Sequence, residues 1–284
     1  MTIKNSFNLM FLFLFAVCAG FAQDSGPAAP AAKDPFSPKT LVEESIKKVP
    51  CKSPDRKEGV RQLFLDAGAE EKDIVLEPFD KDRAANVVIK KPGKSAEVIV
   101  IGAHHDRTAT GCGATDNWSG LAIIAHIYRT LRTFDTEKSY VFVAFDQEEE
   151  GMKGSREMVK KMSESDRANV CSMVNFDSFG QGYPMALENA SSSKMIQYVK
   201  DLAKESKVNF NAVTIEGSSS DSASFVEKKI PAITLSGLSS NWTSILHSSN
   251  DQVEKVNMDS VYLGYRFGVV LISRLDNSAC GLFR

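Results

Sequence analysis

The sequence has no excess of either charge. Its 284 residues include 34 Lys and Arg against 36 Asp and Glu, which gives a formal net charge of -2 at pH 7. Nucleic acids and anionic membrane surfaces favour proteins with a strong positive excess. We therefore expect no nucleic-acid partner. The chain also lacks the 20-to-50-residue repeats that would indicate a solenoid or propeller, so one domain with a single sizeable core is the simplest organisation.

Long apolar runs are also scarce, and the one at residues 9–17 lies close to the N-terminus. Lys4 precedes this run and Gly20-Phe21-Ala22 follows it, as in a signal peptide cleaved before Gln23. A membrane-spanning helix needs about 20 apolar residues, so a retained anchor is the less favoured alternative. We expect a signal peptide at 1–22, a flexible leader at 23–38 and a folded domain at 39–284. The mature protein would then be secreted or periplasmic, with no stable membrane insertion.

Cysteine is sparse, and no two cysteines form a CxxC pair, which argues against a cysteine-based zinc site. Cys18 would leave with the signal peptide. The remaining Cys51, Cys112, Cys171 and Cys280 permit disulfides in an exported chain, with three possible connectivities. Unpaired buried thiols are an equally good interpretation of the sequence alone.

From residue 39 onward, helical and strand patterns alternate along the chain. Helices are expected from 39 to the residue before Pro50 and at 57–68, 120–131, 154–162, 192–204 and 258–274. Strands are expected at 85–89, 96–102, 139–145, 170–176 and 230–235. This alternation predicts an α/β fold: a single domain with a central mixed, mostly parallel sheet flanked by helices on both faces.

Imidazoles and carboxylates follow the predicted strands, at the edge where α/β sheets bind ligands. The chain contains only 4 His, yet two of them fall at such positions. The candidate metal ligands that follow or adjoin these strands are His104, Asp116, Glu149, Asp177 and His247. Zinc binds neutral imidazole and carboxylate groups, and two metals about 3.5–4 Å apart need a carboxylate that both share.

Two further acidic residues complete the predicted chemistry. Glu148, beside Glu149, is the candidate general base, because adjacent loop residues can direct one carboxylate to a metal and the other to a water molecule. Asp106 is two residues from His104 and is expected to accept the ring N–H that the metal does not need.

These residues lie in motifs that resemble those of the M28 family of zinc peptidases, a group that includes bacterial leucyl aminopeptidases. The resemblance covers roughly residues 104–251. Its five motifs occur in order: Ala103-His104-His105-Asp106; Gly113-Ala114-Thr115-Asp116-Asn117-Trp118-Ser119-Gly120; Glu148-Glu149-Glu150-Gly151-Met152-Lys153-Gly154-Ser155; Asn175-Phe176-Asp177; and His247-Ser248-Ser249-Asn250-Asp251.

The resemblance implies a zinc-exopeptidase fold over residues 39–284 and two zinc ions per chain. It places His104 and Asp177 on one ion, Glu149 and His247 on the other, and Asp116 between them. Glu148 would activate the water and then protonate the leaving amine. Peptides would be the substrates, and their N-terminal residue would be removed.

Some positions depart from the family pattern. The family often has Ser-Asp-His where this chain has Ser220-Asp221-Ser222, which leaves the role of Asp221 open, and Glu150 stands at a commonly apolar position that could alter the pocket. Glutaminyl-peptide cyclotransferase, with one zinc on the same fold, is the main alternative. The cyclases resembled here carry Trp at the position of Leu246, which favours the peptidase. A binding protein that has lost the chemistry is a third possibility, although every ligand position is present.

Three aromatic residues near the motifs are interpreted from their positions alone. His105 is expected to point away from the metal, and His126 to be structural because it lies on an apolar helix. Trp118 could equally form a wall of the substrate pocket or pack in the core.

Overall fold

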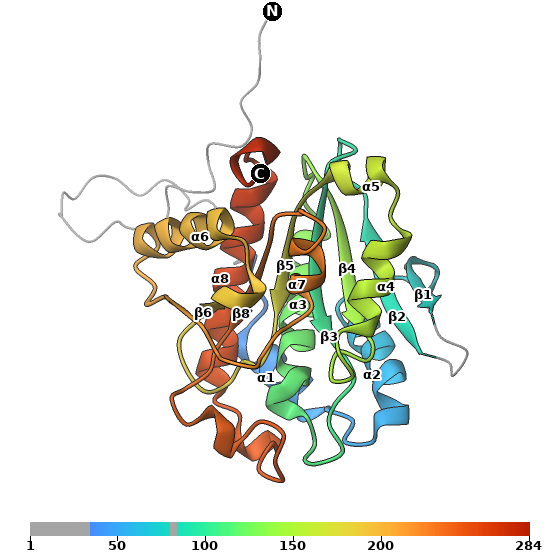
Figure 1. Ribbon diagram of the computed structural model, residues 1–284. Coiled ribbons are helices and arrows are strands. Elements are labelled where there is room, and N and C mark those ends of the chain that lie inside the picture. The colour runs from blue at the N-terminus through green and yellow to red at the C-terminus, as the bar shows by residue number, and fades with distance from the viewer. Residues whose placement is uncertain (1–34, 80–83) are drawn as a thin grey trace, which may run out of the picture. The chain divides into compact units, whose positions relative to one another are not determined.

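The structure is a computed structural model that describes residues 35–79 and 84–284 (Figure 1). Residues 35–284 fall into one compact unit. The predicted signal peptide at 1–22 and most of the predicted leader lie outside the described residues. Within the described part of the chain, no helix is long and apolar enough to cross a membrane.

A single eight-stranded sheet runs through this unit, in the order β1-β2-β4-β3-β5-β8-β6-β7. Its strands are β1 (Ile74–Pro78), β2 (Ala85–Lys91), β3 (Val98–His104), β4 (Ser139–Phe145), β5 (Val170–Phe176), β6 (Met185–Leu187), β7 (Asn211–Val213) and β8 (Ala232–Ser236). The central strands β4, β3, β5 and β8 are parallel, whereas β2 and β6 join them antiparallel. The prediction of a mixed, mostly parallel sheet is therefore confirmed.

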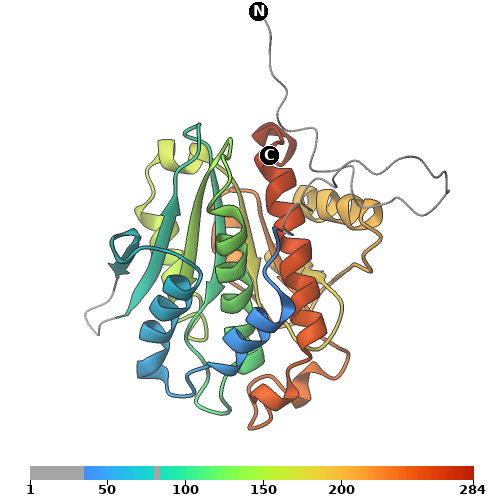
Figure 2. The same ribbon diagram turned by 180° about the vertical axis from the view of Figure 1, so that it is seen from behind.

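Helices cover both faces of the sheet, as predicted. They are α1 (Lys39–Lys47), α2 (Ser53–Asp66), α3 (Ser119–Leu131), α4 (Lys153–Lys161), α5 (Glu164–Asn169), α6 (Ser193–Glu205), α7 (Ser222–Val226) and α8 (Met258–Asp276). Helices α1, α2, α3, α6 and α8 contribute to the larger buried cluster. Helices α4 and α7 pack in a second cluster on the other face of the sheet, and Figures 1 and 2 show the two layers from opposite sides.

The elements that the sequence did not predict are all short. Strands β6 and β7 have three residues each, β1 and α7 have five, and α5 has six, which is too few for a periodic pattern to emerge. Helix α2 begins at Ser53 rather than at 57, because Pro54 fits the first turn of a helix. Strand β3 continues to His104 instead of ending at 102, so the first candidate ligand is the last residue of the strand.

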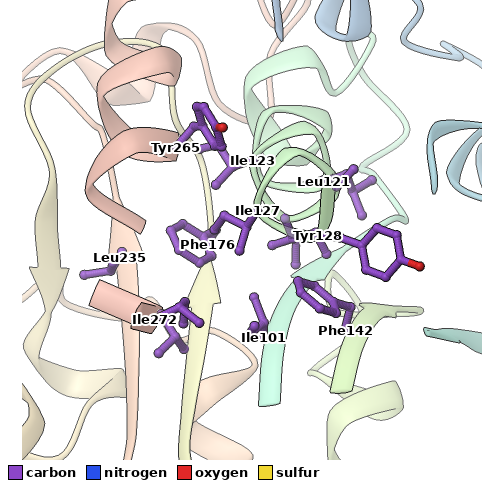
Figure 3. Packing of buried hydrophobic residues seen from close by; sticks show 14 of the residues in the cluster. Ile101, Leu121, Ile123, Ile127, Tyr128, Phe142, Phe176, Leu235, Tyr265 and Ile272 are labelled. Carbon is purple, nitrogen blue, oxygen red and sulfur yellow. The ribbon is translucent and has the colours of Figure 1, made fainter. Parts of the chain in front are cut away.

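The core behind the strand ends is built around α3, in which every residue except Arg129 is buried. Ile123 and Ile127 of this helix pack near Phe176 of β5, the residue that precedes the candidate ligand Asp177 (Figure 3). Helix α8 packs closely against Phe176 at Gly268, which has no side chain. A Cβ at this position would lie 2.8 Å from Phe176 Cζ. The carboxyl end of β5 is therefore held by dense apolar packing.

Two disulfides resolve the connectivity that the sequence left open. Cys51 pairs with Cys112, and Cys171 pairs with Cys280. The first ties the segment before α2 to the loop that precedes Asp116. The second ties the start of β5 to the C-terminal segment of the chain.

Replacement of Phe176 by alanine should lower the free energy of unfolding by about 3–5 kcal/mol, because it leaves a cavity beneath the end of β5. Urea unfolding followed by circular dichroism measures this loss. The control is Tyr183→Ala, since Tyr183 is 62% exposed, and its effect should stay within about 0.5 kcal/mol. Equal losses in the two variants would contradict this account of the core.

Candidate metal centre

The sheet register brings the candidate ligands to one edge. Gly102 of β3 is paired with Asn175 of the parallel strand β5, so His104 and Asp177, each two residues further on, emerge at the same level. His104 is also paired with Phe145, the last residue of β4, and the loop after Phe145 carries Glu148 and Glu149. The predicted convergence at the carboxyl ends of the strands follows from this alignment.

Four distances define two clusters that share Asp116. His104 Nε2 lies 3.1 Å from Asp116 Oδ1 and 3.5 Å from Asp177 Oδ1. His247 Nε2 lies 3.0 Å from Asp116 Oδ2 and 3.2 Å from Glu149 Oε2. The structure thus brings all five predicted ligands together, and each carboxylate oxygen of Asp116 belongs to a different cluster.

Both clusters have the chemistry and spacing of a zinc site. Zinc takes imidazole nitrogen and carboxylate oxygen at about 2.0–2.2 Å, so the ligand atoms around a tetrahedral ion lie roughly 3.3 Å apart. The observed separations of 3.0–3.5 Å match this value. Among the described residues, the other carboxylate oxygen of Glu149, Oε1, is buried and has no hydrogen-bond partner, so this ligand candidate has an unused acceptor. The residues present therefore fit zinc in both positions.

Asp106 connects the first cluster to the loop of the candidate base. Its Oδ1 lies 3.3 Å from His104 Nδ1, the ring nitrogen that faces away from the other carboxylates. The backbone N–H groups of Glu148 and Glu149 donate to its two oxygens at 3.0 and 3.1 Å. Asp106 therefore lies where the sequence predicted, beside the imidazole, and it also holds the 148–149 turn, which the sequence did not predict.

Asp251 and Asn117 position the segment around Asp116, and sequence reasoning assigned neither of them a role. The backbone N–H groups of Thr115 and Asp116 donate to the two oxygens of Asp251, at 2.7 and 3.1 Å. Asn117 donates to the carbonyl of Phe176 at 2.9 Å, the last residue before Asp177. The only sequence signals were that Asp251 closes the His247 motif and that Asn117 follows the bridging Asp.

Glu148 lines a cavity of about 410 Å³ together with Asp116, Glu149, Asp177 and His247. Burial raises the pKa of its carboxyl group well above the usual value; the His104 imidazole opposes this shift, and the carboxylates of Asp177, Asp221 and Asp116 add to it. A carboxylate with a raised pKa takes up a proton more readily, which suits a general base.

Asp221 is fully buried at the start of α7. Burial raises the pKa of this carboxyl group to about 7. Its neighbour Ser220 donates a hydrogen bond to Asp177 Oδ2. Ser220 therefore orients a candidate ligand, and Asp221 places a second acidic group behind Glu148 and the first cluster.

The remaining residues singled out in the sequence lie outside the two clusters. Glu150 is exposed, pairs with Lys153 at 2.5 Å and is not among the residues that line the cavity, which answers the question that the sequence left open about the pocket. His105 Nε2 lies 3.2 Å from the carbonyl oxygen of Ala85 and points away from the clusters, as predicted. Trp118 is 1% exposed and donates to Ser45 O at 2.8 Å. Of the two roles that the sequence left open, Trp118 therefore has the one of packing in the core. His126 is also structural, since it lies 3.0 Å from Ser45 Oγ.

The ligand imidazoles hold protons strongly in the absence of metal. Burial lowers the pKa of His104, but Asp106, Asp116 and Asp177 outweigh this effect and raise it well above the usual value. Hydrogen bonds with Asp116 and Glu149 raise the pKa of His247 to about 10. Protons and metal therefore compete for the same nitrogen lone pairs.

Comparison with known proteins places the chain in a family. The sequence model of Peptidase family M28 matches residues 86–263. The chain is 28% identical over 167 residues to Aminopeptidase YwaD of Bacillus subtilis, covering 55% of this chain and 36% of that protein. It is 23% identical over 223 residues to Leucine aminopeptidase 2 of Arthroderma otae, covering 68% and 45% of the two chains. The chain belongs to Peptidase family M28, as the motifs predicted, although it spans less than half the length of these curated relatives.

Solved structures share the fold. The LapA aminopeptidase of Legionella pneumophila superposes with a TM-score of 0.70 at 19% identity, covering 84% of this chain and 72% of that one. A glutaminyl cyclase from an Acidobacteriales bacterium superposes with a TM-score of 0.71 at 17% identity, covering 90% and 99% of the two chains. The zinc-exopeptidase fold predicted from the motifs is therefore confirmed.

Zinc binding should release protons, roughly one from each ligand imidazole, because the metal needs the neutral ring. Because the pKa of His247 is about 10 without metal, protons compete more strongly for this nitrogen as the pH is lowered. Zinc affinity should therefore fall with decreasing pH. Calorimetric titration of metal-free protein in two buffers with different protonation enthalpies measures the release. His247→Ala should release fewer protons. Heats that are independent of the buffer would contradict the prediction.

Asp251→Asn should weaken zinc binding by about 10–100-fold, the usual effect of losing a group that positions a ligand. The asparagine side chain offers one acceptor where Asp251 offers two, so either Thr115 or Asp116 loses its backbone partner. Competition with a chromophoric chelator measures the affinity. Glu254→Gln, a change at an exposed residue in the same part of the chain, should leave it unchanged. An unaltered affinity in Asp251→Asn would refute the assigned role.

Proposed function

We propose that this chain is a secreted aminopeptidase that uses two zinc ions to hydrolyse the N-terminal residue from peptides. The observation that carries the proposal is the division of Asp116 between two clusters, each of which adds one imidazole and one further carboxylate. Membership of Peptidase family M28 supports hydrolysis of a peptide bond. The apolar run at residues 9–17 supports secretion.

His104, Asp116 and Asp177 would hold one zinc ion, and Asp116, Glu149 and His247 the other. Bound there, zinc would supply Lewis-acid polarisation of the scissile carbonyl and make a nearby water molecule more acidic. Glu148 takes the proton from the attacking water and delivers it to the leaving amine. Asp106 accepts the backbone N–H of Glu148. This contact keeps the base in the cavity that Asp116 also lines.

The cavity favours a free amine over a C-terminal carboxylate. Its lining includes Glu216 in addition to the acidic metal ligands. Among the described residues that line it, none is a lysine or arginine that could pair with a C-terminal carboxylate. The lining also includes apolar side chains, among them Leu187, Ile215, Leu238 and Trp242. These features support aminopeptidase activity on residues with apolar side chains.

Glutaminyl-peptide cyclisation remains the second candidate, because the structural likeness covers 99% of the Acidobacteriales glutaminyl cyclase. A cyclase of the kind considered from the sequence uses one zinc ion and would not need Asp177 as a ligand. Here Asp177 is buried and lies 3.5 Å from His104, in one cluster with Asp116. The complete first cluster favours the peptidase.

The decisive experiment incubates purified, zinc-loaded protein with aminoacyl-nitroanilides and, in parallel, with an N-terminal glutaminyl peptide. Glu148→Gln should lower kcat for nitroanilide release by about 10²–10⁴-fold while the zinc content stays unchanged, because a general base is lost but no ligand. The matched control is Glu150→Gln, a neighbouring exposed residue outside the site, which should retain activity.

Release of nitroaniline that a chelator abolishes and zinc restores would support the aminopeptidase. Cyclisation of the glutaminyl peptide without nitroaniline release, together with one zinc ion per chain, would establish the cyclase instead. Zinc-loaded protein that transforms neither substrate class would overturn both assignments and favour a binding protein.

A further inference from the structure

Arg56 is a fully buried cation behind the metal centre, and none of the proposed catalytic steps uses it. It lies in the first turns of α2 and is 0% exposed. Burial lowers the pKa of its guanidinium group to about 10, so the group stays charged at neutral pH. A buried charge is costly unless it is well partnered, which makes its contacts informative.

The guanidinium donates to backbone carbonyl groups rather than to a carboxylate partner. It reaches Cys112 O at 3.1 Å, Gly113 O at 3.3 Å and Pro50 O at 3.3 Å, and its Nε–H donates to His105 O. A planar guanidinium carries five donors in a fixed fork and can therefore join several carbonyls at once. Its charge also faces the nearby carboxylates of the site.

These carbonyls belong to the two segments that carry His104 and Asp116. His105 is the residue between the ligand His104 and its partner Asp106. Cys112 and Gly113 form the turn that leads to Asp116. Arg56 thus fixes both ends of the 105–113 loop and, with them, the spacing between the strand-end imidazole and the shared carboxylate.

Two independent features show that this turn is closely restrained. The Cys51–Cys112 disulfide joins it to the segment just before α2. Gly113 has a φ of 66°, and a Cβ there would lie 3.2 Å from Arg56 Nη1 and 2.8 Å from the carbonyl oxygen of Asp116. Only glycine fits this close approach without strain.

The second cluster depends less on Arg56. Glu149 lies in the loop after β4, and its backbone is held by Asp106. His247 lies in the loop after β8 and is 57% exposed. Arg56 donates to neither of these loops, so its influence on the second cluster acts through Asp116 alone.

We propose that Arg56 is a positioning residue for the metal centre, and that it sets the zinc affinity of the cluster formed by His104, Asp116 and Asp177 more strongly than that of the cluster with Glu149 and His247. The inference rests on the proposed function, in which both clusters hold zinc. It assigns to Arg56 the geometry of the site rather than a direct part in the reaction.

The test compares the intact protein with Arg56→Met, Arg56→Lys and the control Arg61→Met. Arg61 lies on the same helix and pairs with Glu58 and Glu71 at the surface. Zinc affinity and stoichiometry are measured by chelator competition, and the ligand geometry by the visible absorption of the cobalt-substituted protein. Thermal unfolding of the metal-free proteins reports on folding.

In Arg56→Met, the zinc affinity of the site formed by His104, Asp116 and Asp177 should weaken by about 10–100-fold, and the cobalt spectrum should change. The site with Glu149 and His247 should change less. Arg56→Lys should also weaken it, since a single ammonium keeps the charge but cannot span the same carbonyls. Arg61→Met should match the intact protein. Unchanged affinity in Arg56→Met, or full recovery in Arg56→Lys, would overturn the positioning role.

If the Arg56 variants do not fold, nuclear magnetic resonance of the unsubstituted protein decides the matter. The Arg56 Nε–H resonance should shift when zinc is added, whereas that of Arg61 should not, and an unmoved Arg56 resonance would refute the proposal. Intact protein that binds a single zinc ion would overturn the two-zinc function, yet the affinity ratio between variant and intact protein would still decide the role of Arg56. Protein that binds no zinc would overturn both.

Discussion

The crowding of carboxylates at one edge of the sheet is the constraint on which the rest of this structure depends. The ends of parallel strands and the turn before α3 bring Asp116, Glu148, Glu149 and Asp177 into one cavity, and Asp221 is buried nearby. Carboxylates removed from water repel one another and lose solvation. The protein therefore has to supply compensating positive charge, hydrogen-bond donors or bound cations within a few ångströms.

Positive charge and hydrogen-bond donors are both present near the site, and they come from different parts of the fold. Two imidazoles face Asp116 from opposite sides. Asp106 and Asp251 stand behind the ligands, and each accepts two backbone N–H groups. Arg56 adds a buried positive charge. The dense core beneath β5 fixes the strand end from which Asp177 projects, so the groups cannot relax apart.

The sequence predicted which candidate ligands converge at the sheet edge, because their positions are local consequences of strand ends. His104, Asp177 and the 148–149 pair each follow an apolar strand, and that pattern is visible in a single stretch of chain. The sheet order and the short strands β6 and β7 were not predictable in this way, since three-residue strands have no period. The family resemblance supplied the assignment of ligands to individual ions.

The supporting residues could not be predicted because their partners are distant in sequence. Asp251 accepts the backbone N–H of Thr115 across 136 positions, and Arg56 reaches the carbonyl of Cys112 across 56. Asp251 lies outside the strands and the long helices, and Arg56, although one turn before Val60 on the buried face of α2, is a charged residue that an apolar pattern does not include. Burial of a charged side chain was the signal that identified both, and burial is known only once the chain is folded.

The supporting residues gather around Asp116 because both clusters share its carboxylate. A ligand that serves one ion can shift slightly and leave the other ion undisturbed, but a carboxylate shared by two clusters transmits any displacement to both. Restraint is accordingly densest around this residue, with a disulfide at Cys112, two N–H groups held by Asp251, and the Asn117 side chain tied to β5. Glu149 and His247 lie in loops that border the cavity, and His247 is 57% exposed. The site thus combines a densely restrained shared carboxylate with a histidine ligand position at its more exposed rim.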